Sequence, residues 1–573
     1  MGILYLTRHL LPCAETITLG STEETELPCL QTVVIDGPSL VYDVYHRLLA
    51  CMSPACDILD VQPTCNEVSR GVVIFLHRLA IQGVDVKQIC FDGALPLSKR
   101  STRLSRIEKS RSRLEACRRQ SFAMRKECRR EMSSDVISSA IWRSRSLPTR
   151  WKNLPENPFM VSAVFEDLIH RWNKTSIQHE FDFELACLPD AEYPWSNITI
   201  MVPGEADVGC ARVTKMTGAA ILTSDSDLLV HDLGLNGSVA FLNTLQLIEE
   251  SQENSTATEL RAQRISPADL CRRLGIPNIQ RFAFELSRNP QAPFNELLRL
   301  AKEYDEGEES SSEYVEFLRE YREDHSLNMK KDVLISRQMD PRVSELFWQY
   351  ELPDTYSETP PFHVYLGLLH EDHSRRCAWE QARAYRSLGY ALLDLSRPEN
   401  QRSGSIHEFV RRGTRVVAEQ VTLPGEKSVM STLKYLQQRL NIARGVFQGY
   451  SLSDFWFLFA FSEVYEEISS TATIPSAKKL ESFLGKGYMG NSGADWADIH
   501  LLAQVQAVLY SLRMLQQFIL ITAATYDIGL YRNMLEDLPP LYLLMRPRGE
   551  IIGGFSEKET CRRAVQQLVQ NYG

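Results

Sequence analysis

The chain has 573 residues, a net charge of −10 and 44% hydrophobic residues. This length predicts more than one domain, and the hydrophobic content is sufficient for packed cores. The most apolar stretch, FWFLFAF, is too short to cross a membrane as a helix. The 13 cysteines include no CxxC pair, so neither a zinc ribbon nor a disulfide framework is indicated. We expect a reduced intracellular protein without a secretory signal.

Strand-like runs alternate with helical periodicity in the first half of the chain. The expected strands are Thr32–Ile35, Lys87–Phe91, Ile198–Val202, Ala219–Leu222 and Val239–Leu242. Helical periodicity is strongest over Val72–Gln82 and Ala206–Lys215, whereas Glu180–Trp195 is irregular. Strands that alternate with helices predict a parallel sheet covered on both faces.

Six carboxylates follow four of these strands. They are Asp36 in VVIDGPSLVY, Asp92 in QICFDG, Glu205 and Asp207 in VPGEAD, and Asp225 and Asp227 in ILTSDSD. If the strands are parallel neighbours, their C-terminal ends meet at one edge of the sheet, where α/β folds place their sites. Such an all-oxygen group suits Mg²⁺ or Mn²⁺, and pairs of these ions commonly promote phosphodiester cleavage.

Each acidic motif also has a simpler interpretation. Taken alone, Asp36 is more often a helix N-cap or a turn residue. The GEAD motif is a good helix start near the positive end of the helix dipole, and SDSD fits an Asx turn. All four motifs in this order, each after a strand, favour the metal site.

Positive charge is concentrated between Lys99 and Lys152. This segment contains 17 Lys or Arg residues and 5 Asp or Glu residues, so its net charge is +12 while the rest of the chain carries −22. Basic residues recur every three or four positions from Arg100 to Arg113, which places them on one helix face. We expect this segment to bind a polyanion, because phosphates relieve the repulsion along that face. The alternative is a solvated basic loop or a nuclear localisation signal.

The second half of the chain has a different pattern. Residues 303–324 are acidic and contain serine, which predicts an exposed connection or a solvated helix. Later helical periodicity covers Trp379–Leu393, Val429–Leu440, Leu452–Glu467 and Ile499–Tyr526. We therefore expect an α/β domain over 1–300, an acidic connection over 301–328 and a mostly α-helical domain over 329–573.

Five motifs together resemble the flap endonuclease/XPG superfamily of structure-specific nucleases, and within it the asteroid group. They are MGILYL, VVIDGPSLVY, FDGALPLSKR, VPGEADVGCA and ILTSDSDLLVHDLG, which lie within residues 1–245. The resemblance implies a PIN-like parallel sheet flanked by helices and a basic helical arch over 99–155. It also implies a divergent C-terminal domain that is mostly α-helical.

The resemblance implies roles for individual residues. The six carboxylates would bind two Mg²⁺ or Mn²⁺ ions, directly or through water. Lys99 and Arg106 match the basic pair that contacts the scissile phosphate, and Tyr42 matches an aromatic residue that stacks on a base near the cut. Gly2 matches the residue that lets the N-terminus approach DNA. Further nucleic-acid contacts are expected from the arch residues Arg100, Arg103, Lys109, Arg113, Arg118, Arg119, Arg125, Lys126, Arg129 and Arg130.

The sequence departs from this family after its last acidic motif. The family has a seventh carboxylate in a segment like LLGSDY, followed by a glycine-rich hairpin that grips duplex DNA. The counterpart here, FELSRNPQAPFNELL, has Asn289 at the position of the acid and Pro290 and Pro293 in place of glycines. Glu285 is the alternative acid. We expect the duplex-binding hairpin to be absent or rebuilt.

These observations predict a nuclear, structure-specific, divalent-metal-dependent endonuclease. Its expected substrates are branched or single-strand-bearing DNAs with flaps, overhangs or junctions. The C-terminal half is expected to pack on the nuclease domain and to select substrates by shape or by docking a protein partner. The alternative is a catalytically weak or inactive nuclease-like scaffold that binds RNA or protein partners. Six retained acids favour the enzyme, since a domain freed from catalysis would lose such costly charges first.

Overall fold

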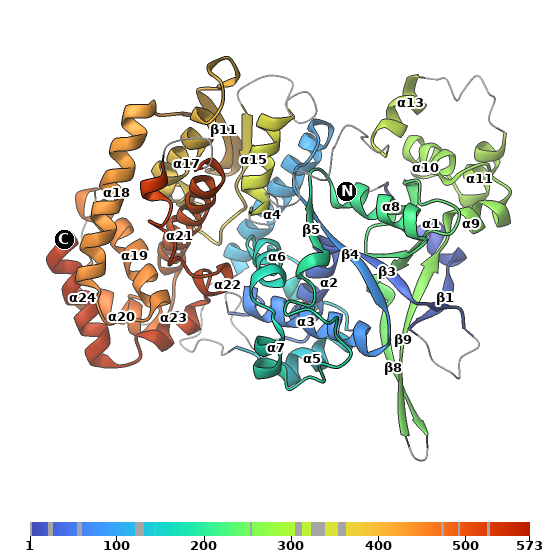
Figure 1. Cartoon of the computed structure of the whole chain (residues 1–573), viewed down its shortest axis with the longest axis horizontal. Helices are drawn as coiled ribbons and strands as arrows, with labels where there is room; N and C mark the ends of the chain where they lie inside the picture. The colour runs from blue at the N-terminus through green and yellow to red at the C-terminus, as the bar shows by residue number, and fades with distance from the viewer. Residues whose placement is uncertain are drawn as a thin grey trace.

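The computed structural model joins an α/β N-terminal half to a largely helical C-terminal half (Figure 1). It describes residues 3–20, 27–53, 60–120, 131–143, 145–252, 255–303, 312–321, 339–352, 362–471, 475–490, 493–523 and 528–573. Within these ranges, no helix combines the length and apolar character needed to span a membrane.

A mixed sheet forms the centre of the N-terminal half. Its central strands, in spatial order, are β7 (Ser238–Phe241), β6 (Ala220–Thr223), β3 (Thr32–Asp36), β4 (Asp85–Asp92) and β5 (Thr199–Val202). All neighbours in this group are parallel, which confirms the expected parallel sheet. Side chains alternate between the faces of β3, so Val33 and Ile35 enter one apolar core while Val34 enters another.

Four further strands extend the sheet beyond β7, and the sequence analysis did not predict them. They are β1 (Glu15–Leu19), β2 (Cys29–Leu30), β8 (Gln246–Gln252) and β9 (Ser255–Ile265). Strand β9 runs antiparallel to β7, β1 and β8, and the β8–β9 hairpin projects from the body of the molecule (Figure 1). These strands mix polar with apolar residues, so their local signal is weaker than that of the buried parallel strands.

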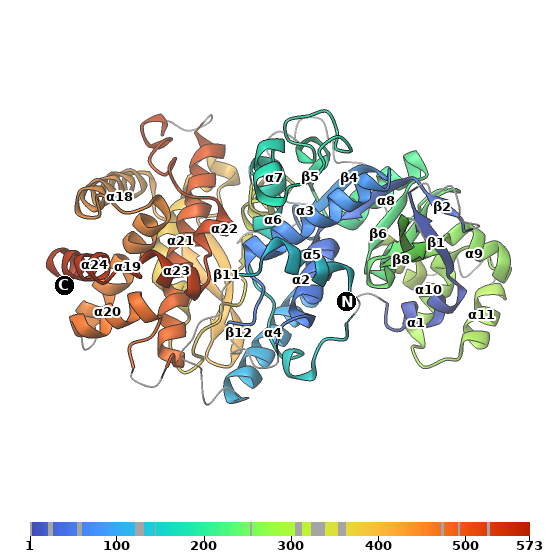
Figure 2. The same cartoon turned by 90° about the horizontal axis from the view of Figure 1, so that it is seen from below.

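Helices cover both faces of this sheet (Figure 2). Those of one core are α2 (Gly37–Ala50), α3 (Cys65–Ile81), α5 (Ser134–Trp142), α6 (Met160–His170) and α7 (Lys174–Phe181). Those of the other core are α1 (Leu6–Leu10), α8 (Ala206–Thr217), α9 (Pro267–Leu274), α10 (Ile279–Arg288) and α11 (Phe294–Lys302). Two of these helices, α3 and α8, confirm the strongest helical expectations of the sequence.

The basic segment begins with a single-turn 3-10 helix, Leu97–Lys99, and continues as α4 (Arg100–Gln120). This long helix confirms the helical spacing of the basic residues. Residues 121–130 of the expected arch lie outside the described part of the chain. Helix α4 packs against the second sheet, in the C-terminal half, rather than extending away from the protein.

The C-terminal half is mostly helical, as expected, but it also contains a small sheet that the sequence analysis did not predict. Its strands are β10 (Phe362–Tyr365), β11 (Ser405–Arg412) and β12 (Arg415–Thr422). The shortest strand, β10, pairs in parallel with β11, which lies forty residues later in the chain. The local sequence pattern cannot predict such a pairing, because the strand that β10 hydrogen-bonds to is distant in the chain.

The rest of the C-terminal half is mainly helical. Its helices are α15 (Pro341–Glu351), α17 (Arg383–Leu395), α18 (Glu426–Val446), α19 (Leu452–Thr471), α20 (Ala477–Lys486), α21 (Trp496–Thr522), α22 (Leu541–Leu544), α23 (Arg548–Gly554) and α24 (Lys558–Tyr572). A fully buried ion pair joins sheet and helix, with Arg386 Nε on α17 2.7 Å from Glu408 Oε1 on β11. The same guanidinium donates to Ser511 Oγ on α21 at 3.0 Å and to the carbonyl of Trp379 at 2.9 Å.

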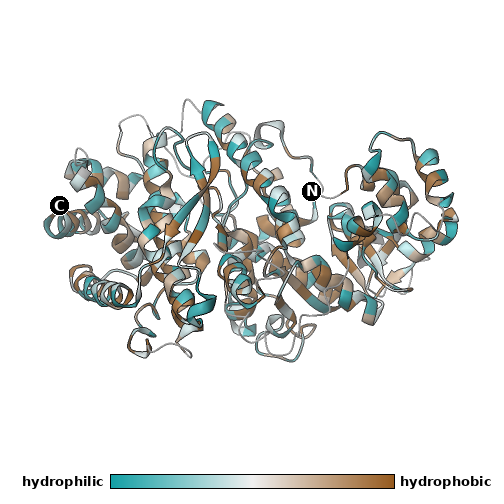
Figure 3. Ribbon diagram, turned by 90° about the horizontal axis from the view of Figure 1, so that it is seen from above, coloured by the Kyte–Doolittle hydropathy of each residue, from teal (hydrophilic) through white to brown (hydrophobic). Residues whose placement is uncertain are grey.

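The two halves share a continuous interface. Phe159 and Ala163 of the N-terminal half belong to the same apolar core as the C-terminal helices. In Figure 3, hydrophobic residues gather along the strands and the inward helix faces, while hydrophilic residues mark the outer surface. The C-terminal half therefore packs on the N-terminal half, as the sequence analysis expected.

Candidate metal centre and nucleic-acid interface

The first carboxylate sits where two neighbouring strands end. Asp36 ends β3 and caps α2, since Ser39 N donates to its Oδ1 at 3.2 Å. Thr223, the last residue of β6, donates through Oγ1 to Asp36 Oδ2 at 2.7 Å. The N-cap interpretation is thus correct, and the same side chain also faces the end of the adjacent strand.

The end of β4 is linked in a similar way to the start of α8, the helix that follows β5. Asp92 ends β4, and its Oδ1 accepts from the amide of Ala206, the first residue of α8, at 2.7 Å. Glu205 occupies the N-cap position of α8, and Asp207 lies in its first turn. The helix start predicted for GEAD is confirmed, and it lies next to Asp92.

The last two acids start the short 3-10 helix Ser226–Val230 after β6. Asp225 caps this helix by accepting from the amide of Asp227 at 3.0 Å. The amide of Ile3 donates to Asp227 Oδ1 at 2.7 Å, which brings the start of the chain to the same edge of the sheet. Asp225 and Asp227 therefore form a local turn and also lie at the edge of the sheet where the other acids are found.

Charge repulsion shows that the acids lie close together. Burial raises the pKa of Asp207 well above its usual value, and the nearby Asp36, Asp225, Asp92 and Glu205 raise it further. Burial likewise raises the pKa of Asp36 to about 6, despite hydrogen bonds from Thr223 and Ser39. The four motifs, which are far apart in sequence, thus form one electrostatic unit.

Lys99 provides positive charge at this edge. Its Nζ lies 3.4 Å from Glu205 Oε1. Burial alone would lower the pKa of Lys99, but attraction to Glu205 and Asp207 outweighs burial and raises it. Arg106 is exposed on α4 and lines a cleft with Asp92 and Tyr42. Tyr42 keeps 41% of its surface exposed, so its ring is accessible from this cleft.

The residues fit a divalent cation by their chemistry, because carboxylate oxygens are the ligands that Mg²⁺ and Mn²⁺ prefer. The raised pKa of Asp207 also shows negative charge that the surrounding protein does not compensate. As the side chains are placed, however, no three His, Cys, Asp or Glu residues in the described ranges are close enough to hold an ion together. The number and position of bound ions stay predictions.

Several residues predicted to bind nucleic acid are already in contact with protein groups. Arg103 pairs with Glu345 at 2.5 Å and Arg118 with Asp372 at 2.8 Å, both across the interface between the halves. Further contacts are Arg100 over the Phe409 ring, Arg113 with Glu156, and Arg119 with Glu115. Lys109 is exposed. Gly2, Arg125, Lys126, Arg129 and Arg130 lie outside the described residues.

Neither candidate for the seventh acid has a free negative charge. Asn289 follows the last residue of α10 as its C-cap. Glu285 is buried on α10, and its Oε1 lies 2.9 Å from a guanidinium nitrogen of Arg281. The Glu285 charge is therefore compensated within its own helix.

The structure adds residues to this region that the sequence analysis missed. Glu345 of α15 lies near Asp92, which contributes to raising the pKa of Glu345 after burial, while Arg103 and Arg342 oppose the shift. Glu320, which follows α13 (Ser312–Arg319), is among the acids that raise the pKa of Lys99. No motif or spacing marks these residues, since each reaches the site only through packing.

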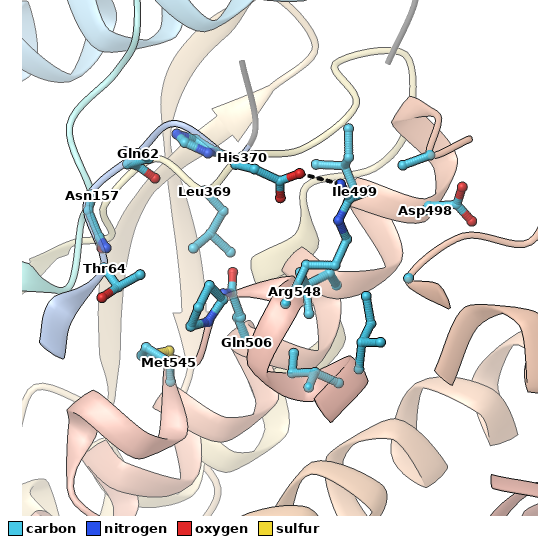
Figure 4. A pocket seen from close by; sticks show the side chains of 18 of the residues that line it. Gln62, Thr64, Asn157, Leu369, His370, Asp498, Ile499, Gln506, Met545 and Arg548 are labelled. Atoms are coloured by element: carbon cyan, nitrogen blue, oxygen red, sulfur yellow. Dashed lines mark hydrogen bonds and ion pairs between the residues drawn. The ribbon is translucent and has the colours of Figure 1, made fainter. Parts of the chain in front are cut away.

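A second cavity, of about 130 Å³, lies between the two halves (Figure 4). Gln62, Thr64 and Asn157 line it from the N-terminal half, and Leu369, His370, Ile499, Gln506 and Met545 line it from the C-terminal half. The ion pair between Arg548 and Asp60, at 2.6 Å, crosses the interface here. Its lining contains none of the six predicted metal ligands, so it is separate from the acidic edge.

Residues 156–423 match a family model described as XPG domain containing. The matched segment includes Glu205, Asp207, Asp225 and Asp227, and it continues through β12 of the second sheet. Over these residues, which are less than half of the chain, the protein is similar to proteins that contain an XPG domain. No curated protein matches the chain.

We predict that the metal-free protein loses stability as the pH rises from about 4 to about 7. Burial and repulsion from Asp225 raise the pKa of Asp227 to about 6. The folded state then binds more protons than the unfolded chain in this window, so the free energy of unfolding falls with rising pH. Asp227→Asn should stabilise the metal-free protein at pH 7 by on the order of 2 kcal/mol, and hardly at pH 4. Thermal unfolding at both pH values measures this difference.

Asp232→Asn is the matched control. A hydrogen bond from Lys215 lowers the pKa of the exposed Asp232, which is the opposite shift, so this substitution should give no gain at pH 7. An Asp227→Asn protein that is no more stable than the wild type at pH 7 would contradict the repulsion inferred for the acidic edge.

Proposed function

We propose that this protein is a structure-specific, divalent-metal-dependent endonuclease of the asteroid type. One observation supports the proposal: six carboxylates from four motifs follow parallel strands whose C-terminal ends share one edge of the sheet, near Lys99 and Arg106. The expected substrates are DNAs with single-stranded flaps, overhangs or junctions. The expected location is the nucleus, where the C-terminal half would also dock a protein partner.

The residues at this edge would have different roles in phosphodiester hydrolysis. The six carboxylates would hold two Mg²⁺ or Mn²⁺ ions, which when bound activate water and stabilise the leaving oxygen. Lys99 and Arg106 provide fixed positive charge for the phosphate as negative charge develops on it. Tyr42 offers an exposed ring on which a neighbouring base can stack.

We predict that Asp92→Ala and Asp225→Asn each lower the cleavage rate by on the order of 100-fold or more. Both residues belong to the acidic edge, and neither lies on α4, so DNA affinity should change little. Cleavage of a panel of labelled branched DNAs and a separate binding assay measure the two effects.

Asp85→Asn is the matched control for Asp92→Ala. Asp85 starts the same strand, is 57% exposed and lies at the opposite edge of the sheet. This control should cut like the wild type. If the Asp92 and Asp225 variants also cut like the wild type, the assigned centre is wrong.

We predict that the exposed side of α4 captures the DNA strand. Lys109 is exposed and Arg119 has 76% of its side chain exposed, although it also contacts Glu115. Replacing both with Ala should weaken DNA binding and reduce the slope of log affinity against log salt by about two. The control is Arg272→Ala, equally exposed on α9 and remote from α4 (Figure 1). An unchanged salt slope would make α4 a solvated surface or a targeting signal.

The alternative function is a catalytically weak or inactive scaffold that binds RNA or protein partners. The pairing of α4 with the C-terminal half favours it, because Arg103 and Arg118 already contact carboxylates. The two functions differ in metal binding. The enzyme should gain thermal stability with rising Mg²⁺ or Mn²⁺, and Asp225→Asn should lose this gain while Asp85→Asn keeps it. A wild-type unfolding temperature that does not depend on either metal would favour the scaffold.

A further inference from the structure

The cavity of about 130 Å³ between the two halves has a mainly apolar wall (Figure 4). Pro158 and Phe159 line it from the N-terminal half, and Leu369, Phe457 and Phe483 line it from the C-terminal half. An apolar cavity of about 150 Å³ can hold benzene, whereas drug-sized ligands need pockets of about 300 Å³ or more. The space here therefore matches one six-membered ring with a short substituent.

The charged residues around this cavity already have partners in the protein. Arg548 pairs with Asp60 at 2.6 Å, and Glu131 lies 3.8 Å from Arg70. Asp498 accepts from two backbone amides, at 2.9 and 3.0 Å. An ionised ligand would have to compete with these partners and would also lose its hydration, which is costly. The cavity therefore favours a neutral ligand.

Gln506 of α21 is a polar lining residue with unused hydrogen-bonding capacity. Gln62 donates to the carbonyl of Pro155 at 2.8 Å, and Thr64 Oγ1 accepts from a backbone amide at 3.0 Å. Gln506, in contrast, makes no hydrogen bond to the described residues. It is only partly buried, and its amide nitrogen and oxygen both keep accessible surface. A ligand in the cavity can therefore reach this amide.

The chemistry of Gln506 limits what pairs well with it. A glutamine side chain offers N–H donors and a carbonyl acceptor side by side. A ligand group that also donates and accepts, such as a carboxamide or a lactam, can exchange two hydrogen bonds with it. A purely apolar ligand would leave the amide without a partner, which lowers its affinity.

We propose that this cavity binds a small neutral molecule that carries a carboxamide or lactam group on an apolar ring. The amide edge of the ligand pairs with Gln506, and its ring packs against the apolar wall. Because the ligand contacts both halves in the folded state, its binding stabilises their attachment. The site does not depend on the proposed nuclease function, since its lining contains none of the six acids of the sheet edge.

Calorimetric titration of the full-length protein with benzamide tests the site. Benzamide is neutral and consists of one ring and one carboxamide. Benzoate and benzylamine have the same ring but carry a charge at neutral pH. Benzamide should bind at least about tenfold more tightly than either of them, because the charged analogues must give up their hydration without gaining a free counter-charge.

Two variants locate the ligand. Gln506→Met keeps the length of the side chain and removes the amide, so it should weaken benzamide binding about tenfold. Gln504→Met, on the same helix but outside the lining, is the matched control and should bind like the wild type. Ile499→Trp should fill the cavity and weaken binding at least about tenfold. Its control is Leu520→Trp, at a 37% exposed position of α21 outside the lining.

Each result decides the question. Failure of benzamide to bind would mean that only water occupies the cavity, and would overturn the site. Equal affinities for benzamide and benzoate, or unchanged binding to Gln506→Met, would overturn the assignment of a neutral amide ligand. If Ile499→Trp does not fold, the comparison of Gln506→Met with Gln504→Met still settles whether the ligand lies here. Cleavage of DNA enters none of these measurements, so failure of the nuclease function leaves them unaffected.

Discussion

The accumulation of negative charge at one edge of the parallel sheet is the constraint on which the rest of this structure depends. Backbone and hydroxyl donors hold the acids there, as Thr223 does for Asp36 and the amide of Ala206 does for Asp92. These hydrogen bonds stabilise individual carboxylates, but they do not remove the repulsion that raises the pKa of Asp207. Lys99 lies against this edge at Glu205, and Arg103 and Arg106 lie near Asp92. A charge arrangement of this kind is costly without a cationic ligand.

Helix α4 contributes side chains both to the cleft and to the interface between the two halves. Arg103 and Arg106 of α4 both line the cleft beside Asp92, and Arg103 also pairs with the C-terminal half, as Arg118 does. Carboxylates of the C-terminal half therefore neutralise part of the positive charge expected to attract DNA. In return, the pair between Arg103 and Glu345 holds α15 next to the acidic edge. The positive charge of α4 thus contributes to the attachment of the two halves.

The family match is consistent with this close association. It begins at residue 156 and ends at residue 423, so it includes the acidic motifs of α8 and β6 together with the small second sheet. The domain boundary predicted near residue 300 coincides with a change in amino-acid composition along the chain. In space, however, Phe159 and Ala163 share an apolar core with the C-terminal helices. The cleft is complete only when both halves are present.

The sequence by itself determined the parallel sheet, its acidic edge and the basic helix, because periodicity and strand-end motifs are local signals that parallel pairing then brings together. It also determined the caps that Asp36 and Asp225 form. Only the tertiary structure decided that β10 pairs with β11, and that Glu345 lies beside Asp92 more than 250 residues away in the chain. The physical reason is that a side chain such as Glu345 carries no local pattern, so its position depends on how whole helices pack and which ion pairs they complete.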